Sequence, residues 1–187
     1  MLGLPRGGVI VADRVARCLG WPLGVVNVRK IGHPRHREFA VGALAENDVL
    51  LLDSSALESK SVIWAELDDV IQEEKIRLRQ NQSRFHLGAP LELAGRTVLV
   101  VDDGLATGAT AEAAVLSVRK QAPLRIIVAV PVASAGAIAR LERVADMVRA
   151  LQVDPEFDAV GRYYQSFPQT SDEEVIHLLE SARPRPA

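Results

Sequence analysis

The chain has 187 residues, of which 48% are hydrophobic, and its formal net charge is −2. This length and composition suit one folded domain with a sizeable core, and the near-neutral charge excludes a general attraction to nucleic acid or to an anionic membrane. The sequence has neither a run of about 20 apolar residues nor a signal-peptide pattern, so we expect a cytoplasmic protein. The single cysteine, Cys18, cannot form an internal disulfide, and its apolar helical surroundings predict burial.

Strand and helix patterns alternate along the chain. Branched apolar runs of strand length, separated by helical segments, predict an α/β fold with a central, mostly parallel sheet flanked by helices. Ligands of such sheets bind at the carboxyl ends of the strands. In chain order the predicted elements are strand 1–4, helix 9–19, strand 23–28, a hairpin of strands 41–44 and 49–52, helix 61–86, strand 97–101, helix 110–121, strand 126–130, helix 135–144, strand 147–151 and helix 172–181.

The elements form one unit. We predict a single domain over residues 1–182 and a disordered tail over residues 183–187, because the Arg-Pro repeat of the tail offers nothing to bury. The helix predicted over 61–86 is acidic early and basic late. This distribution complements the helix dipole, so we interpret that helix as structural.

One segment joins a strand, two acids and a loop of small residues. Strand 97–101 runs into Asp102 and Asp103 and then into the small-residue loop, residues 104–110, which opens a helix. Gly and Ala let backbone N–H groups approach an anion, and the helix start adds free N–H groups and a positive dipole end. Acids that touched a phosphate would repel it, so these acids suit sugar hydroxyls or a hydrated Mg²⁺. The segment therefore predicts a sugar-phosphate site. The loop residues are Gly104, Leu105, Ala106, Thr107, Gly108, Ala109 and Thr110.

Other phosphate-binding motifs do not fit this segment. Gly104 and Gly108 are one residue too close for the loop of nucleoside-triphosphate enzymes, and Ala109 stands where that loop needs a lysine. The dinucleotide-binding motif has a different glycine spacing and no preceding acids. A receiver domain would begin near this strand, and too few residues follow Asp102 to complete one.

Residues 98–114 resemble the phosphoribosyl pyrophosphate (PRPP) motif of the type I phosphoribosyltransferases. The resemblance implies an α/β fold with a small hood, and transfer of ribose 5-phosphate from PRPP to a nucleobase or similar acceptor with release of pyrophosphate. It also implies Mg²⁺ as cofactor, held by Asp102 and Asp103 through water. In this family the two acids contact the ribose hydroxyls, and residues matching Gly104 to Thr110 hold the 5′-phosphate.

Two further segments are candidates for binding the diphosphate. Arg6 and Gly7 lie in the turn after the first predicted strand, at the sheet edge expected to hold Asp102, and this turn resembles the pyrophosphate loop. Arg29 and Lys30 follow the second strand and suit the same leaving group. Together with the acid pair they are the predicted catalytic residues, since they would offset charge on the departing pyrophosphate.

Arg29 and Lys30 begin a basic segment, residues 29–37, and residues 31–37 are its remaining part. By resemblance this remaining part forms a flexible catalytic loop that closes over the site and excludes water. For Arg35, His36 and Arg37 a solvated basic loop is an equally open interpretation.

Aromatic residues gather in residues 154–167, which we name the hood segment. Their rings suit stacking on a planar base, and the family covers its base with a small hood. Phe157 and Tyr163 are the predicted base contacts. A satellite hydrophobic cluster under a long loop is the alternative.

Two departures from the family pattern leave other functions open. Ala106 stands where hypoxanthine-type members have an aspartate, so a general base must lie elsewhere. Family members commonly have a helix before the first strand, whereas this sequence begins inside that strand, so either Met1 is a late start or the protein lacks that helix. A PRPP- or nucleotide-binding regulator without turnover is therefore one alternative, and a hydrolase or phosphotransferase for another sugar phosphate is a second. The sequence leaves the oligomeric state open, with a homodimer among the options.

Overall fold

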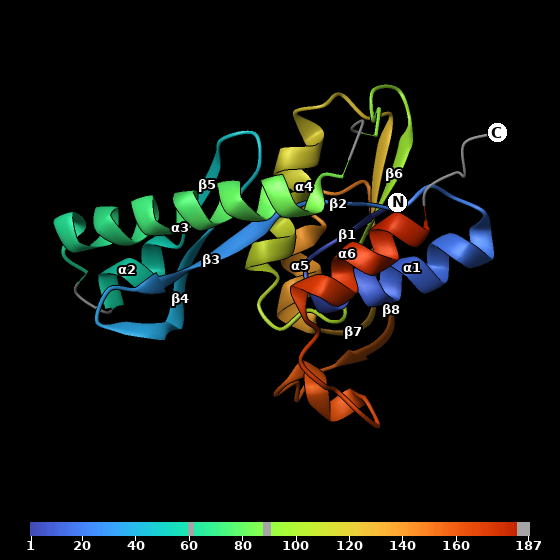
Figure 1. Ribbon diagram of the computed structural model, residues 1–187. Helices are drawn as coiled ribbons and strands as arrows, with labels where there is room; N and C mark the ends of the chain where they lie inside the picture. Colours follow the sequence, from blue (N-terminus) through green and yellow to red (C-terminus); the bar gives the residue numbers. More distant parts are fainter. Residues whose placement is uncertain (60–61, 88–90, 183–187) are drawn as a thin grey trace.

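The computed structural model describes residues 1–59, 62–87 and 91–182. Its elements are β1 (Leu2–Gly3), α1 (Gly7–Leu19), β2 (Gly24–Val25), β3 (Val28–His33), β4 (His36–Ala45), β5 (Val49–Leu52), α2 (Ser54–Ser59), α3 (Trp64–Phe85), β6 (Thr97–Val101), α4 (Ala109–Arg119), β7 (Arg125–Ser134), α5 (Ala135–Leu141), β8 (Met147–Asp154), the 3₁₀ helix η1 (Val160–Tyr163) and α6 (Asp172–Ser181). Five of the strands form a parallel sheet in the order β2-β1-β6-β7-β8, and β3, β4 and β5 form a separate antiparallel sheet. The predicted parallel sheet flanked by helices is confirmed (Figure 1).

Helices cover both faces of the parallel sheet (Figure 1). On one face, α1 and α6 share an apolar cluster to which Val9 and Val175 contribute. On the other face, α4 and α5 form the larger cluster with the strands, including Val115 and Leu141. Burial on both faces explains why β6 is a nearly continuous run of branched apolar residues. None of the helices in the described residues is long and apolar enough to span a membrane.

The order of the strands places two turns side by side. β1 lies between β2 and β6, and Gly3 pairs with Val101. The chain segments that follow β1 and β6 therefore leave the sheet at the same edge. Gly3 also lets α1 approach the sheet, because a Cβ at this position would lie only 2.8 Å from the Cα of Val9.

The strand predicted over 23–28 is split between the two sheets. β2 ends at Val25 and β3 begins at Val28. At the break, the backbone N–H and the side-chain amide of Asn27 donate hydrogen bonds to the Glu46 carboxylate at 2.9 and 2.5 Å. These buried polar contacts hold the antiparallel sheet to the end of the parallel one.

The prediction of a loop over the basic segment is wrong. β3 and β4 form an antiparallel hairpin, and only residues 34–35 form a turn between them. Gly32 permits this close pairing, because a Cβ there would lie 2.3 Å from the carbonyl oxygen of Arg37. Arginines of the hairpin are held by acids of α3, with Arg35 pairing with Glu66 at 2.8 Å, so the density of positive charge is compatible with a regular strand.

Other differences are small. The helix α2 is not predicted from the sequence, although the Asp53 carboxylate accepts a hydrogen bond from the Ala56 N–H at 3.1 Å, as an N-terminal cap does. The helix predicted from residue 61 begins at Trp64, and Ser61 lies outside the described residues. The predicted burial of Cys18 is wrong, since it is exposed on α1. The predicted disordered tail, residues 183–187, also lies outside the described residues.

Candidate active site

Asp102 and Asp103 follow the last residue of β6, where the parallel strands end. Two glycines at the start of α1 make room for them. A Cβ on Gly7 would lie 1.8 Å from Oδ2 of Asp103, and a Cβ on Gly8 would lie 2.8 Å from the Cα of Asp102. The N–H of Asp103 donates to Oδ1 of Asp102 at 2.9 Å. The turn after β1 and the acid pair after β6 are therefore fitted against each other.

The acid pair is electrostatically strained. Burial and the neighbouring charge of Asp103 raise the pKa of Asp102 well above its ordinary value, and burial also raises the pKa of Asp103. A nearby cation or hydrogen-bond donors from a ligand would relieve both effects. The site is thus suited to bind a partner that stabilises two adjacent carboxylates.

The small-residue loop is anchored at its start and open further along. The N–H of Leu105 donates to the Val132 carbonyl at 3.0 Å, and the N–H of Ser134 donates to the Leu105 carbonyl at 2.9 Å. Leu105 is itself buried, so it anchors the loop on β7. Ser134 adds a hydrogen bond from its hydroxyl to the Ala106 carbonyl at 2.6 Å.

Backbone donors remain available beyond this anchor. Within residues 1–59, 62–87 and 91–182, the N–H groups of Ala106, Thr107, Gly108 and Thr110 donate to no protein acceptor. Gly108 has a φ of +74°, a left-handed conformation that suits glycine, and it caps the start of α4. Successive free N–H groups at a helix N-terminus form an anion-binding arrangement.

A cleft of about 770 Å³ joins this loop to the basic residues expected near it. Asp102 and Thr110 line one side of it. Arg6 reaches it from the turn after β1, and Arg29 and Lys30 reach it from β3. The cleft therefore brings Asp102 and Thr110 together with Arg6, Arg29 and Lys30. Asp103 and Gly7 line a separate cavity beside α1. The remaining cleft residues are Leu4, Pro5, Val28, Gly32, Arg37, Glu38, Glu73, Glu74, Arg77, Asn81 and Asp172.

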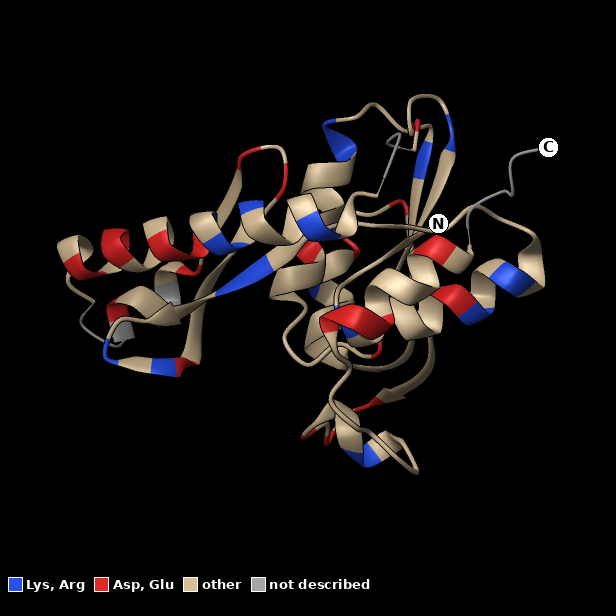
Figure 2. Ribbon diagram, viewed as in Figure 1, with Lys and Arg blue, Asp and Glu red and all other residues tan. Residues whose placement is uncertain are grey.

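The predicted diphosphate residues have protein partners in this structure. Arg6 lies 3.8 Å from the Asp172 carboxylate, and the peptide bond between Pro5 and Arg6 is cis. Arg29 donates from Nε to Glu74 at 2.7 Å, and Lys30 donates to the Glu38 carbonyl at 3.1 Å. Figure 2 shows that acidic residues are concentrated in the first half of α3 and that basic residues lie on β3 beside it.

Phe157 and Tyr163 line neither the 770 Å³ cleft nor the cavity of about 440 Å³ beside Asp103. Their rings stack on each other with centroids 5.3 Å apart. The Tyr163 hydroxyl donates to the Asp154 carboxylate at 2.6 Å, which raises the pKa of Tyr163 to about 12. A role for this pair in base stacking stays a prediction.

Other hood residues lie against the site. The Tyr164 hydroxyl donates to the Asp103 carbonyl at 2.6 Å, and its ring is 5.0 Å from that of Phe167. Both rings line a second cavity of about 440 Å³ on the α1 side of Asp103. Burial and the charges of the acid pair raise the pKa of Tyr164 to about 12. Val160 packs on the loop, since a Cβ at Gly104 would lie 2.8 Å from it.

Sequence reasoning also missed Glu74 and Arg77 of α3. Glu74 is only 5% exposed and accepts hydrogen bonds from Arg29 and from Arg77. A signal was present, because residues 67, 71, 74 and 78 share the buried face of the helix and an acid among them requires a cationic partner. The sequence does not say which cation, since Arg29 is 45 residues away.

Asp102 and Asp103 fit a divalent cation that is held mainly by its ligand and by water. No group of three or more His, Cys, Asp or Glu side chains in the described residues could form a protein cage for a metal. Mg²⁺ is commonly bound by one or two carboxylates, with substrate phosphates and water completing its coordination. The raised pKa values of Asp102 and Asp103 agree with this, because a nearby cation would stabilise their ionised forms.

Comparisons with known proteins agree with this architecture. Residues 1–165 match the family model described as phosphoribosyl transferase domain. The chain is 41% identical over 183 residues to Mycobacterium tuberculosis proteins named "Putative phosphoribosyl transferase MT0597" (strain CDC 1551 / Oshkosh) and "Putative phosphoribosyl transferase Rv0571c" (strain ATCC 25618 / H37Rv). Each match covers 97% of this chain and 41% of the relative, so the chain spans less than half the length of these relatives.

Solved structures share the fold. The crystal structure of TT1426 from Thermus thermophilus superposes with a TM-score of 0.77 at 43% identity, covering 98% of this chain and 87% of that one. The structure of the AQ2163 protein from Aquifex aeolicus superposes with a TM-score of 0.50 at 15% identity, covering 82% and 53%. On the family match and the identity to these relatives, the chain belongs to the phosphoribosyl transferase domain family.

Proposed function

We propose that this chain transfers ribose 5-phosphate from PRPP to a nucleobase or similar nitrogenous acceptor and releases pyrophosphate. One observation carries the proposal: a cleft of about 770 Å³ joins Asp102 of the acid pair, Thr110 at the start of α4 and a set of basic side chains. These three features match the ribose diol, the 5′-phosphate and the diphosphate of PRPP in charge and in hydrogen bonding.

The phosphate end would bind the small-residue loop. The free N–H groups of Ala106, Thr107 and Gly108 supply donors, and the start of α4 supplies the positive end of its dipole. Asp102 and Asp103 would accept hydrogen bonds from the ribose 2′- and 3′-hydroxyls. Donors from a diol stabilise the ionised acids, whose raised pKa values reflect a lack of such partners.

The reaction replaces the C1–oxygen bond to diphosphate by a C1–nitrogen bond to the acceptor. The electron pair of the broken bond leaves with pyrophosphate, and positive charge develops on the ribose ring in the transition state. Arg6, Arg29 and Lys30, with the N–H of Gly7, would offset charge on the leaving group. The carboxylates of Asp102 and Asp103 favour positive charge on the ring, and positioning supplies much of the remaining rate.

Asp102 and Asp103 would hold Mg²⁺ through water. The bound ion supplies positive charge to the diphosphate oxygens. At the acceptor side, we propose that Phe157 and Tyr163 contact the base. A side chain other than Ala106 must accept the proton of the acceptor, because Ala106 has no titratable group. We also propose that the protein acts in the cytoplasm, in nucleotide metabolism.

A double variant tests the proposed site. We expect calorimetry with Mg²⁺ to show PRPP binding to the wild-type protein and none to Asp102→Asn, Asp103→Asn, with the circular dichroism spectrum of the variant unchanged. Equal affinity of the two proteins for PRPP would refute the proposal.

Ala106 favours one second candidate, a regulator that binds PRPP without turnover, because the described loop has no acid to assist proton transfer. Incubation with PRPP, Mg²⁺ and a panel of bases, with pyrophosphate as readout, separates the two. Release of pyrophosphate with one base supports the transferase, and tight binding without release on any base supports the regulator. Cleavage of ribose 5-phosphate in the absence of PRPP would instead indicate a hydrolase.

A further inference from the structure

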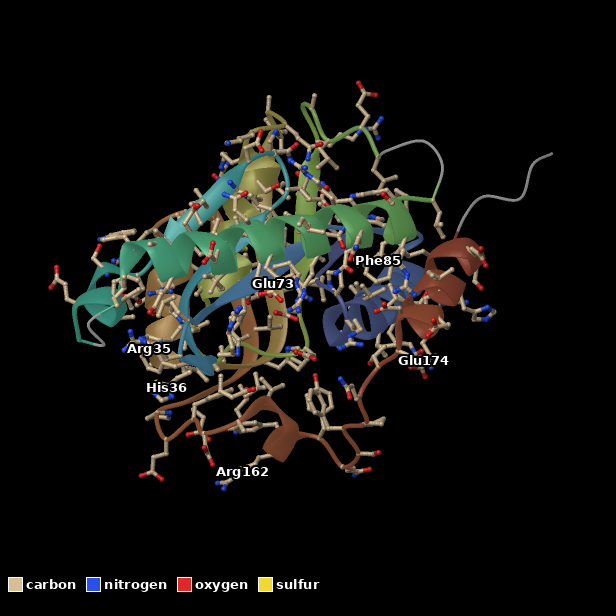
Figure 3. All side chains as sticks on the ribbon, turned by 60° about the vertical axis from the view of Figure 1, so that its left-hand side comes forward. Arg35, His36, Glu73, Phe85, Arg162 and Glu174 are labelled. Atoms are coloured by element: carbon tan, nitrogen blue, oxygen red, sulfur yellow. The ribbon has the colours of Figure 1, made fainter. Side chains whose placement is uncertain are left out.

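Five charged side chains form a ladder of alternating sign along one wall of the cleft. Glu74 accepts hydrogen bonds from Nε of Arg29 at 2.7 Å and from Nη1 of Arg77 at 2.9 Å. Glu73 accepts one from Nη2 of Arg77 at 2.5 Å and pairs with Arg37 at 3.0 Å. The charge ladder thus runs Arg29, Glu74, Arg77, Glu73, Arg37 and connects β3, α3 and β4. Figure 3 shows Glu73 on the side of α3 that faces the strands.

The charge ladder keeps positive charge available to the cleft. Its three guanidiniums outnumber its two carboxylates, which leaves a net charge of +1 on the ladder itself. Elsewhere in the lining of the cavity, Arg6 and Lys30 are balanced by acids, so the surplus of positive charge is local to the ladder side. These acids are Glu38, Asp102 and Asp172. The side chains of Arg77 and Arg37 are 49% and 50% exposed. A guanidinium has five N–H donors, so each arginine retains donors that its carboxylate partner does not use.

The ion pairs of the charge ladder also hold its arginine side chains in fixed positions. Glu74 is buried on the core-facing side of α3 and holds one guanidinium with each carboxylate oxygen. Paired, planar guanidiniums lose less conformational freedom when an anion binds than free arginines would. Asn81 lies one turn after Arg77, on the same face of α3, and lines the same cleft.

We propose that Arg77, with Arg29 and Arg37, forms the α3 wall of the diphosphate subsite, and that Glu74 is the positioning residue that aligns Arg29 and Arg77. This inference rests on the proposed function. The small-residue loop has backbone N–H donors for the 5′-phosphate, and its Thr110 lines the cleft that also holds the arginines. The arginines are therefore suited to the diphosphate, which is the other charged end of PRPP. Arg6, from the turn after β1, lines the same cavity and would contact this end as well.

Three ligands measured by calorimetry with Mg²⁺ test the proposal: PRPP, inorganic pyrophosphate and ribose 5-phosphate. Arg77→Gln should weaken binding of PRPP and of pyrophosphate by about tenfold or more and leave ribose 5-phosphate unchanged, because only the first two carry a diphosphate. Arg79→Gln is the matched control. Arg79 is exposed on the same helix, does not line the cleft, and has no ion pair within the described residues. Its substitution should change none of the three affinities.

The variant Glu74→Gln distinguishes two effects of Glu74 on pyrophosphate binding: alignment of the arginines, and the negative charge of the carboxylate. This variant adds one net positive charge to the wall, so a purely electrostatic effect would tighten pyrophosphate binding. If Glu74 aligns the arginines, pyrophosphate binding weakens severalfold while ribose 5-phosphate binding is unchanged. Tighter binding of pyrophosphate by this variant would overturn the positioning role.

The remaining outcomes are distinguishable. Unchanged pyrophosphate affinity in Arg77→Gln, or an equal loss of all three ligands, overturns the α3 subsite. In either case PRPP binding by the wild-type protein still supports the proposed function. A wild-type protein that binds neither PRPP nor ribose 5-phosphate overturns the proposed function itself.

Discussion

The Tyr164 hydroxyl donates a hydrogen bond to the backbone oxygen of Asp103 across 2.6 Å, and this contact ties the hood segment to the acid pair. The two residues are 61 positions apart in the sequence. Their contact means that the conformation of the hood and the position of the Asp103 backbone depend on each other. It also places the ring of Tyr164 in the lining of the cavity next to α1, together with Asp103.

Tyr164→Phe should lower the free energy of unfolding by about 1 kcal/mol, because it removes one partly buried hydrogen bond and leaves the Asp103 carbonyl unpaired. Urea denaturation would measure the change. Affinity for PRPP should fall as the Asp103 backbone gains freedom. Tyr163→Phe is the control, since the Tyr163 hydroxyl bonds to Asp154 and not to the acid pair. Equal PRPP affinities in wild type and Tyr164→Phe would contradict the coupling.

Asp102→Asn should raise the thermal stability of the unliganded protein while it abolishes PRPP binding. The pKa of Asp102 is higher in the folded protein than in the unfolded chain, mainly because of burial and then of Asp103, so ionisation at neutral pH opposes folding. Ionised Asp102 does not destabilise the fold at pH values below the pKa that Asp102 has in the unfolded chain. The destabilisation grows as the pH rises from there toward the pKa of Asp102 in the folded protein. For a chain of this length each kcal/mol recovered raises the Tm by about 2–4 °C.

Asp146→Asn is the matched control and should act with the opposite sign. The N–H of Ile126, 2.7 Å away, and then Arg119 lower the pKa of Asp146, so its contribution to stability is present above the unfolded pKa and is lost as the pH falls. This variant should have a lower Tm at neutral pH and unchanged PRPP affinity. A lower Tm for Asp102→Asn at pH 7 would show that the acid pair is not strained.

Gly7→Ala should disrupt the site through sterics alone. Its Cβ would lie 1.8 Å from Oδ2 of Asp103, so either the carboxylate or the start of α1 must move, at a cost of about 1–3 kcal/mol. Gly136→Ala in α5 is the comparison, because the nearest atom to its Cβ would be 3.9 Å away. That helical substitution should stabilise the protein by about 0.5–1 kcal/mol. Denaturant unfolding of both variants would show opposite changes, and PRPP affinity should fall only in Gly7→Ala.

The contact between His86 and Glu46 should make stability depend on pH. The Glu46 carboxylate lies 2.6 Å from Nε2 of His86 and raises the pKa of the histidine above its ordinary value of 6.5, and the Asn27 amide lies 3.3 Å from the same nitrogen. The stabilisation is complete below pH 6.5 and is lost as the pH rises through the folded pKa. Because the His86 side chain is 36% exposed, we expect less than about 1 kcal/mol.

The measurement is the free energy of unfolding of wild type and His86→Ala at about pH 5.5 and about pH 8.5, on either side of the titration. The difference between the two proteins should be larger at the lower pH. A difference that is the same at both pH values would show that the histidine contributes packing and no charge.

Local features could be predicted from the sequence. The strand, the acid pair and the small-residue loop are consecutive, so their carboxylates and backbone N–H groups are close whatever the rest of the chain does. The parallel sheet follows from branched apolar runs that alternate with helices, because only burial on both faces stabilises such runs. The sequence predicts a diphosphate contact for Gly7, but the close fit of Gly7 against Asp103 depends on the pairing of β1 with β6.

Only the tertiary structure decided which distant residues meet. The family resemblance predicts a loop over the basic segment, but pairing of β3 with β4 and ion pairs with α3 make it a hairpin of two strands. Likewise, Glu74 links Arg77 to Arg29, which lies 45 residues before Glu74 in the sequence. Tyr164 contacts Asp103, which lies 61 residues before it. Hydrogen bonds and ion pairs between distant segments depend on how helices and sheets pack. A periodic pattern in the sequence does not predict these distant contacts. The acid pair and the small-residue loop are predictable because their residues are consecutive in the chain and therefore lie close together in space.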